Sequence, residues 1–399
     1  MNVLTTCRSC GSTYLDGIFY KPKAPVAGRF LKKEELEREV LYPLTLAMCK
    51  TCGLVQVLET IEAEELFKDY RYLSSVSGTL VKHFNDYAAW LNKHFGTGYT
   101  YIDVGANDGI LLKPLVRNYQ LRAVGIDPAL NIEVPEDILV LKDFFGKEIA
   151  AKLSVEPAVT EKPIVVTGSN VFAHIPSMHD VLDGVELLIK DDGYFIAEVN
   201  YASDILKFVM FDSVYHEHLF YWSVSSLEHI LHAHGMYINY VEWLPMHGGS
   251  IRVVASKIEE SPLFPRTDFY SVDKFKCIEN YLHVASADVW KSRYKRYTSI
   301  LYDFAQRLQQ YNTVSAYGAA GRATMFFDDL PFKDVAYVID ESEERINRYV
   351  PKVHYPILPP EELYVFPTEA CVISAWTYKN EIKSKERFYT GRWLVPFEQ

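Results

Sequence analysis

The segment 103–109, Asp-Val-Gly-Ala-Asn-Asp-Gly, places an acidic residue at the end of an apolar run and two glycines after it. A glycine loop between a strand and a helix brings the backbone close to a nucleotide cofactor. The spacing differs from the G-x-G-x-x-G of dinucleotide sites, where a pyrophosphate rests on a helix N-terminus. Asp103 would repel that phosphate. S-adenosylmethionine (SAM) carries an ammonium and a sulfonium and no phosphate, so the loop predicts a SAM site.

Further polar residues follow the next strands of this region. Asp127 ends the strand predicted at 123–128, where a carboxylate accepts hydrogen bonds from ribose hydroxyls. We expect Asp143 to bind the adenine amino group and Asn170 to lie near the methyl donor. The predicted cofactor-binding residues are Asp103, Gly105, Asn107, Asp127, Asp143 and Asn170.

Two C-x-x-C pairs, each followed by glycine, lie near the start of the chain. They are Cys7 with Cys10 and Cys49 with Cys52. Four thiolates suit tetrahedral Zn²⁺, and with every ligand position taken by cysteine such a site is structural. Four unrelated buried cysteines, or a redox dithiol, are the alternatives.

The segment 211–223 concentrates titratable side chains, at Tyr215, His216, Glu217, His218 and Tyr221. Upstream, His174 follows Asn170 closely, and downstream His247 precedes two glycines. Adjacent His-Glu-His residues cannot aim three side chains at one ion from regular structure, and the H-E-x-x-H spacing is absent. A histidine general base oriented by a carboxylate fits better. A surface loop with incidental histidines is the alternative.

Alternating helices and strands must position these residues. The segment 79–95 has helical periodicity, with one face formed by Leu80, Phe84, Tyr87, Ala88 and Leu91. Strand patterns at 99–105, 123–128, 164–170 and 193–199 are separated by helix-length segments, which predicts a parallel sheet with crossover helices. Residues 268–312 have helical character, and strand patterns at 314–317, 335–342 and 370–376 predict a second α/β unit.

The length of 399 residues predicts two or three domains, and we expect boundaries that give domains 1–65, 66–257 and 258–399. A net charge of −11 argues against nucleic-acid binding. No apolar run is long enough to span a membrane, and the start lacks the features of a signal peptide. We therefore expect a cytoplasmic protein, which we also expect to be a monomer.

Eight motifs occur in the order of a known family: CRSCG at 7–11, CKTCGLVQ at 49–56, YRYLSS at 70–75, DVGANDG at 103–109, NVFAHIP at 170–176, YHEHLFYWS at 215–223, MHGGSIRV at 246–253 and AYGAAGRA at 316–323. The chain resembles the sugar C-methyltransferase family over essentially its whole length. In kind it is similar to the enzymes that methylate C-3′ of a TDP-4-keto sugar in tetronitrose biosynthesis.

The resemblance implies an α/β protein with three parts: a small N-terminal zinc-binding domain, a Rossmann-like SAM methyltransferase domain and a C-terminal Rossmann-like domain. It also implies that a nucleotide sugar lies between the last two. Carried over by motif, His218 would be the general base that forms an enolate for in-line methyl transfer to the ring carbon. Glu217 and Tyr215 would lie in the same active-site wall, and His174 and Tyr72 would contact the sugar. Tyr215 and His174 would donate hydrogen bonds to the oxyanion.

The C-terminal glycine loop at 318–321 leaves two interpretations open. It supports the substrate's nucleotide or phosphates through backbone amides and Arg322, or it is tight strand–helix packing. The alternatives to a methyltransferase are an NAD-dependent oxidoreductase that uses this C-terminal unit, and a zinc-knuckle interaction protein in which the methyltransferase fold is only a scaffold.

Overall fold

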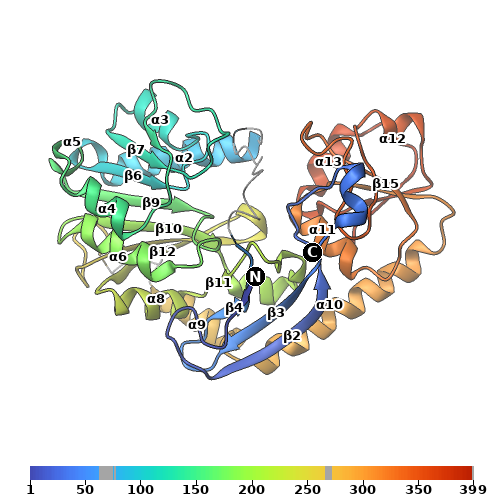
Figure 1. The fold of residues 1–399 in the computed structure, drawn as a ribbon, viewed down its shortest axis with the longest axis horizontal. Helices are drawn as coiled ribbons and strands as arrows, with labels where there is room; N and C mark the ends of the chain where they lie inside the picture. The colour runs from blue at the N-terminus through green and yellow to red at the C-terminus, as the bar shows by residue number, and fades with distance from the viewer. Residues whose placement is uncertain (63–74, 76–77, 266–271, 398–399) are drawn as a thin grey trace.

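The computed structural model describes residues 1–62, 75, 78–265 and 272–397. Within these residues the middle of the chain and its C-terminal part form separate sheets on two sides of the molecule, and the N-terminal strands run beneath both (Figure 1). In this part of the chain, no helix combines the length and the apolar character that crossing a membrane requires.

The middle sheet has the strand order β12-β13-β10-β9-β6-β7-β8. The pairs from β8 to β10 are parallel, whereas β13 runs antiparallel to both of its neighbours. This confirms the four strands predicted between 99 and 199. The strands are β6 (Thr100–Val104), β7 (Ala123–Ile126), β8 (Val140–Leu141), β9 (Ile164–Ser169), β10 (Tyr194–Asn200), β12 (Tyr237–Leu244) and β13 (Ser250–Ser256).

Helices connect and cover these strands. The predicted amphipathic helix is α2, and it buries the five side chains expected from its periodicity. The helices of this region are α2 (Gly78–His94), α3 (Leu112–Arg117), α4 (Lys147–Leu153), α5 (Pro157–Thr160), α6 (Met178–Ile189), α7 (Ala202–Phe208) and α8 (Val224–Ala233). Short 3-10 turns follow at Gly96–Gly98, Phe211–Ser213 and Met246–Gly248.

Strand β6 lies between β7 on one side and β9 on the other. After β6, the chain first adds β7 and β8 on one side of this strand and then adds β9 and β10 on the other side. In open parallel sheets, ligands bind outside the carboxyl ends of the strands where this reversal occurs. The fold thus selects the ends of β6 and β9 as the place for a ligand.

The N-terminal sheet has the order β11-β4-β3-β2 and takes its edge strand from the middle of the chain. Strand β11 (Phe220–Tyr221) pairs antiparallel with β4 (Val55–Val57), with Phe220 opposite Gln56. The other strands are β2 (Leu15–Ala24) and β3 (Tyr42–Cys49), with a 3-10 turn at Lys33–Arg38. A separate two-stranded ladder joins β1 (Asn2–Val3) to β5 (Glu59–Thr60).

The C-terminal sheet is parallel throughout, with the order β16-β15-β14-β17-β18. Its strands are β14 (Val314–Tyr317), β15 (Val335–Ile339), β16 (Ile357–Leu358), β17 (Ala370–Ile373) and β18 (Arg392–Leu394). The helices are α9 (Val272–Leu282), α10 (Ala287–Leu308), α11 (Gly321–Asp329), α12 (Glu362–Val365) and α13 (Lys379–Lys385), with a 3-10 turn at Trp376–Tyr378. The predicted helical connector and second α/β unit are confirmed.

One hydrophobic core links the N-terminal sheet, the segment 202–214, helix α10 and the C-terminal sheet. Phe19 of β2 stacks on Tyr294 of α10 with ring centroids 4.4 Å apart, and Phe211 meets Trp290 edge to face. Helix α10 runs alongside β2 beneath both lobes (Figure 1). The shared core fixes the C-terminal unit to the N-terminal strands.

Candidate active site and metal centre

The four predicted metal-binding cysteines converge. The sulfurs of Cys7 and Cys52 are 3.6 Å apart, those of Cys10 and Cys49 are 3.5 Å apart, and all four lie within 4.8 Å of one another. Tetrahedral Zn²⁺ with Zn–S distances near 2.3 Å requires sulfurs at about this separation. The donor set therefore fits a closed, structural zinc site, as the sequence predicted.

Arg8, within the first knuckle, ties the metal centre to the neighbouring strands. Its side chain donates to the carbonyls of Val57 (3.0 Å) and Glu59 (3.2 Å) and lies over the ring of Phe220. Since Phe220 belongs to β11, the knuckle contacts a strand within the histidine-rich segment 211–223, directly after His218. The zinc centre thus supports the candidate catalytic loop by packing against it, and its four cysteines leave no coordination position for a substrate.

Asp103 lies at the end of β6 and is buried. Its Oδ1 accepts a hydrogen bond from the Thr167 hydroxyl at 2.8 Å. Burial, with the carboxylates of Asp127 and Glu198 nearby, raises the pKa of Asp103 to about 7. No Lys, Arg or His of the described chain forms an ion pair with it. A buried carboxyl group without a cationic partner fits a ligand that brings its own positive charge.

The loop after β6 is held open by backbone conformations that favour glycine. Gly105 has φ +72° and Gly109 has φ +77°, and a Cβ at Gly105 would lie 2.8 Å from Val171. The Asn107 amide donates to Asp127 Oδ2 at 2.8 Å, and the Ala129 amide donates to Asp127 Oδ1 at 2.9 Å. Each carboxylate oxygen has a second lone pair, so Asp127 still has acceptor capacity for a ribose hydroxyl.

Three further predicted positions differ in their surroundings. Asn170 follows β9 with φ +56°, and its amide donates to the Glu198 carbonyl at 2.8 Å. Asp143 is exposed, and its Oδ1 accepts from the amide of Phe144 at 2.8 Å. Tyr72 lies outside the described residues. The strand ends therefore bring Asp103, Asp127 and Asn170 to the same edge of the sheet.

The candidate base His218 has its tautomer set by two neighbours. Its Nδ1 donates to the Ser213 carbonyl at 3.3 Å, and its Nε2 accepts from the Tyr215 hydroxyl at 3.0 Å. These contacts assign the proton to Nδ1 and leave the lone pair on Nε2. Burial lowers the pKa of His218 well below its usual value, and the charge of neighbouring histidines adds to this. The imidazole is therefore neutral at physiological pH.

The carboxylate expected to orient the base makes a different contact, which is a correction to the sequence prediction. Glu217 Oε1 accepts the backbone amide of Gly28 at 2.8 Å, so it binds the N-terminal domain and not the imidazole. The base is oriented instead by the Ser213 carbonyl. Successive side chains of the loop point in different directions, so Glu217 and His218 cannot meet. Burial raises the pKa of Glu217.

His216 and His174 flank the base in different roles. His216 is fully buried, and its Nε2 donates to the Pro43 carbonyl at 2.9 Å, so it anchors the loop to the N-terminal sheet. The ring of His174 meets that of His218 with centroids 4.8 Å apart. Burial lowers the pKa of His174 to about 4, and in the described part of the chain its buried Nδ1 has no hydrogen-bond partner. His174 therefore brings an unpaired donor or acceptor beside the base.

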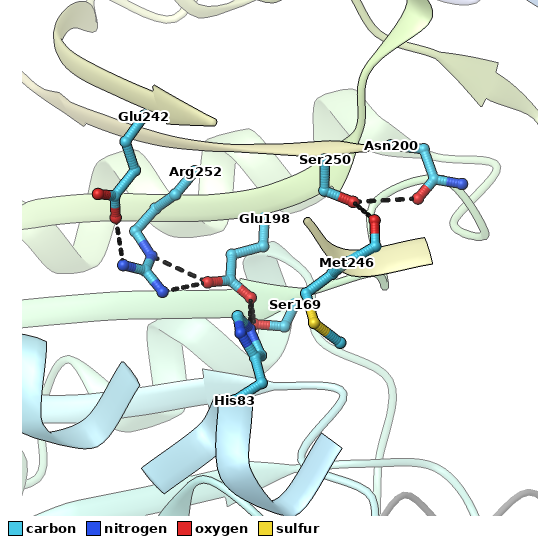
Figure 2. A network of polar contacts seen from close by, with 8 residues as sticks. All are labelled: His83, Ser169, Glu198, Asn200, Glu242, Met246, Ser250 and Arg252. Carbon is cyan, nitrogen blue, oxygen red and sulfur yellow. Dashed lines mark hydrogen bonds and ion pairs between the residues drawn. The ribbon is translucent and has the colours of Figure 1, made fainter. Parts of the chain in front are cut away.

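Sequence reasoning missed a buried charge network under the strand ends (Figure 2). Arg252 of β13 pairs with Glu198 of β10 (Nε to Oε1, 2.9 Å) and with Glu242 of β12. Glu198 Oε2 also accepts from His83 at 2.8 Å and from the Ser169 hydroxyl at 2.9 Å. Despite its burial, these partners lower the pKa of Glu198 to about 2. The only sequence signal was charged residues in otherwise apolar strands.

A second missed feature joins the C-terminal unit to the catalytic region. Arg322 of α11 donates to both carboxylate oxygens of Asp212 (2.9 and 3.1 Å) and to the His247 carbonyl (3.1 Å). Trp376 Nε1 also donates to Asp212 at 2.9 Å, and the guanidinium lies over the indole ring. Arg322, suggested from the sequence as a phosphate contact, is thus occupied by a fully buried carboxylate.

Three family models match successive parts of the chain. They are a putative zinc binding domain at residues 7–67, a methyltransferase domain at 80–240 and a C-methyltransferase C-terminal domain at 245–397. The first contains the four cysteines and the second contains both the loop after β6 and the histidine-rich segment. The matches agree with the predicted fold of an α/β methyltransferase with a zinc-binding domain before it.

The chain is similar to the C-methyltransferase NovU of Streptomyces niveus, with 28% identity over 410 residues that cover 98% of this chain and 95% of the relative. Among solved structures it is similar to a SAM-dependent methyltransferase from Anabaena variabilis (15% identity, TM-score 0.36, 48% of this chain and 90% of that chain). It is also similar to one from Archaeoglobus fulgidus (14% identity, TM-score 0.37, 44% and 94%).

Proposed function

We propose that this chain, which is a SAM-dependent C-methyltransferase, methylates the ring carbon beside the ketone of a 4-keto nucleotide sugar. The observation that carries the proposal is the contact between His174 and His218. His174 follows β9, one of the strand ends where a parallel sheet of this order is expected to bind a ligand, and the imidazole of His218 is neutral. A proton acceptor beside the methyl donor site is what methylation of carbon requires, because a sugar carbon has no lone pair.

The proposed first step is proton abstraction. His218 Nε2 takes the proton from the carbon beside the ketone, and the electrons of the C–H bond form an enolate with the charge on the former carbonyl oxygen. In the structure, the Tyr215 hydroxyl donates to this nitrogen. The hydroxyl therefore has to turn toward the substrate oxygen when His218 takes the proton from the carbon. Contact with Ser213 keeps the imidazole ring in place during this exchange.

The enolate needs hydrogen-bond donors, because a neutral histidine is a weak base toward a carbon acid. Removing one donor from such an oxyanion site costs about 3–4 kcal/mol in other enzymes. We assign this role to Tyr215 and His174, whose polar groups both lie beside the ring of His218. Because burial keeps His174 neutral, it offers one N–H donor and does not compete for the proton.

SAM, when bound, supplies an electrophilic methyl group on a sulfonium. The enolate carbon would then bond to this methyl group as the methyl–sulfur bond breaks and S-adenosylhomocysteine leaves, and the proton on His218 would be released to solvent. On the protein side, Asp103 and Asp127 would bind the cationic and ribose parts. Through family resemblance, Glu217 is assigned to the active-site wall and Tyr72 to contact with the sugar, as part of the same proposal.

The test uses the full-length zinc-loaded protein with a panel of TDP-, GDP- and CDP-4-keto-6-deoxy sugars. Product is detected by mass spectrometry as the addition of one methyl group, and its position by NMR. His218→Asn is expected to lower turnover by about a thousandfold or more, while S-adenosylhomocysteine (SAH) still binds. His232→Asn is the matched control, because His232 is exposed on α8.

A second measurement separates the base from the methyl transfer. With SAH in place of SAM, the wild-type protein in D₂O should exchange the ring proton next to the ketone, and His218→Asn should not. Methylation at oxygen or nitrogen, or turnover by His218→Asn close to that of His232→Asn, would overturn the proposal.

A further inference from the structure

The turn that carries His247 holds an uncommon backbone conformation. His247 has φ +54°, and Gly248 and Gly249 follow with φ +92° and +132°. A left-handed conformation costs a non-glycine residue about 1 kcal/mol or more and persists where the surrounding structure enforces it. Such strain is concentrated at functional sites, which makes this turn a candidate part of the active site.

Several elements fix the backbone of the turn. Arg322 donates to the His247 carbonyl at 3.1 Å, and the Gly249 amide donates to the Met246 carbonyl at 2.9 Å. The carboxylate of Asp204 occupies the space beside Gly249 where a side chain would stand. Figure 2 shows Met246 and Ser250 on either side of the turn, next to the network of Glu198.

The backbone of His247 is fixed, whereas its imidazole nitrogens have no hydrogen-bond partner among the described residues. The residue is half-buried. Burial, reinforced by the charges of Arg322 and His83, lowers the pKa of His247 to about 4. The neutral ring keeps one N–H donor and one lone pair. Arg322, which holds the His247 carbonyl, also pairs with Asp212, and the carbonyl of the adjacent Ser213 accepts from the ring of His218.

We propose that His247 is a further catalytic residue of the methyl transfer, and that its imidazole donates a hydrogen bond to an oxygen of the keto sugar at the reacting end. This inference rests on the function proposed above. The turn lies at the end of β10, because Ser250 directly after it is paired with Asn200, and the C-terminal unit holds the turn through Arg322. The loop at 105–109, which serves the cofactor, takes no part in holding it. The placement therefore favours the methyl acceptor over SAM.

A neutral imidazole is suited to this role, because it polarises a carbonyl without carrying a proton that the enolate would capture. The N–H of His247 would bind the ketone oxygen as negative charge develops there, and the proton stays on nitrogen throughout. No bond is made or broken at His247, so the overall proton balance of the reaction is unchanged.

The test compares His247→Asn and His247→Gly with His283→Asn in the full-length protein. His283 is the matched control, because it has φ +52° but is exposed after α9. Asparagine tolerates this backbone, and glycine relieves its strain, so His247→Gly keeps the fold even if His247→Asn is less stable. Measurements are methyl transfer, proton exchange with SAH in D₂O, and SAH affinity by calorimetry.

Both His247 variants are expected to exchange and methylate about a hundredfold or more slowly than His283→Asn, with SAH affinity within about twofold. Added imidazole should partly restore exchange in His247→Gly. Exchange rates within about threefold of the control, or an equal loss of SAH affinity, would overturn the role of His247. Failure of the wild-type protein to exchange any 4-keto sugar would instead overturn the proposed function, and this inference with it.

Discussion

The chain contains two glycine loops of one design, after β6 and after β14, and they serve different ends. In both, an aspartate at the end of the next strand accepts a backbone amide of the loop: Asp127 accepts from Asn107, and Asp340 accepts from Ala319. Both aspartates also accept the amide two residues further on. The backbone of a nucleotide-type loop is therefore present twice.

The charges beside the two loops differ. After β6, the neighbouring groups are buried carboxyls, and Asp103 has no cationic partner in the described chain. After β14, Arg322 in the first turn of α11 pairs with Asp212. The glycines themselves are alike, because a protein side chain stands where a Cβ would go at Gly105 and at Gly318. The buried negative charge beside the first loop is therefore left for a cationic ligand to balance, whereas the charges beside the second loop balance each other within the protein.

The comparison teaches that a glycine loop identifies a backbone shape and not a ligand. Gly318 permits the close approach of Ala375, which lies just after β17. Arg322, the cation that would meet a phosphate at this loop, pairs with Asp212. Of the two interpretations open from the sequence, these contacts favour tight packing.

The largest effect is expected from Arg322→Ala, which removes the partner of a fully buried carboxylate. We expect a loss of about 2–3 kcal/mol in the free energy of unfolding, measured by urea titration, because Trp376 is the one side-chain donor that Asp212 would keep among the described residues. SAM affinity should stay within about twofold. The double variant Arg322→Ala/Asp212→Asn should recover part of the stability, since it buries no unpaired charge. A weakened SAM site with unchanged stability would contradict the division between the two loops.

Asp103→Asn tests the first loop. We expect SAM affinity at pH 8 to fall by about 2 kcal/mol, because an interaction with a charged group is lost. In the wild type, the carboxyl with its pKa near 7 must lose a proton to bind a cation, so SAM affinity should fall as the pH drops below 7. Calorimetry between pH 6 and 8.5 measures both, and the variant should lack this pH dependence.

The stability of the ligand-free protein should change in the opposite direction. The pKa of Asp103 is raised from about 3.9 in the unfolded chain to about 7 in the fold, so the folded state binds more protons between these values. The contribution of Asp103 to the free energy of unfolding is therefore lost as the pH rises from 4 through 7. Asp103→Asn should melt at a higher temperature than the wild type at pH 8, and an equal or lower melting temperature would show that Asp103 is compensated within the protein.

The smallest effects are expected from Asp127→Asn and Asp340→Asn, which weaken the same hydrogen bond in the two loops. Asp340→Asn also removes the ion pair with Arg345 at 3.3 Å, so Arg345→Gln is its control. Each aspartate variant should cost about 1 kcal/mol. In Asp127→Asn the loss should appear in SAM affinity, and in Asp340→Asn it should appear in the free energy of unfolding, with SAM affinity unchanged. If both variants lost stability and neither lost affinity, the two loops would be equivalent.

Much of the fold was predictable because it is local. Helix α2 and strands β6, β7, β9 and β10 follow from periodicity within short windows, and the cysteine pairs follow from their spacing and the glycines after them. The same holds for Asp103, which ends a strand and therefore reaches the ligand edge of the sheet.

The parts that were missed depend on contacts between distant segments. The sequence suggests that the carboxylate of Glu217 orients the base, but this carboxylate accepts the amide of Gly28. The base contacts the backbone carbonyl of Ser213 instead, and a backbone carbonyl carries no sequence signal. The pairing of Arg322 with Asp212 joins residues more than a hundred positions apart. Tertiary partners decide which of several plausible roles a polar residue has.

The pairing of β11 with β4 has a consequence for synthesis and for engineering. When the zinc knuckles emerge from the ribosome, β4 is an unfinished edge, and the strand that completes it follows only after the whole first half of the methyltransferase sheet. The histidine-rich loop and the metal domain therefore mature together, late. A shortened protein that begins at α2 would keep its SAM loop yet leave β11, which directly follows the proposed base, without its partner strand β4, so the N-terminal domain cannot be treated as a removable module.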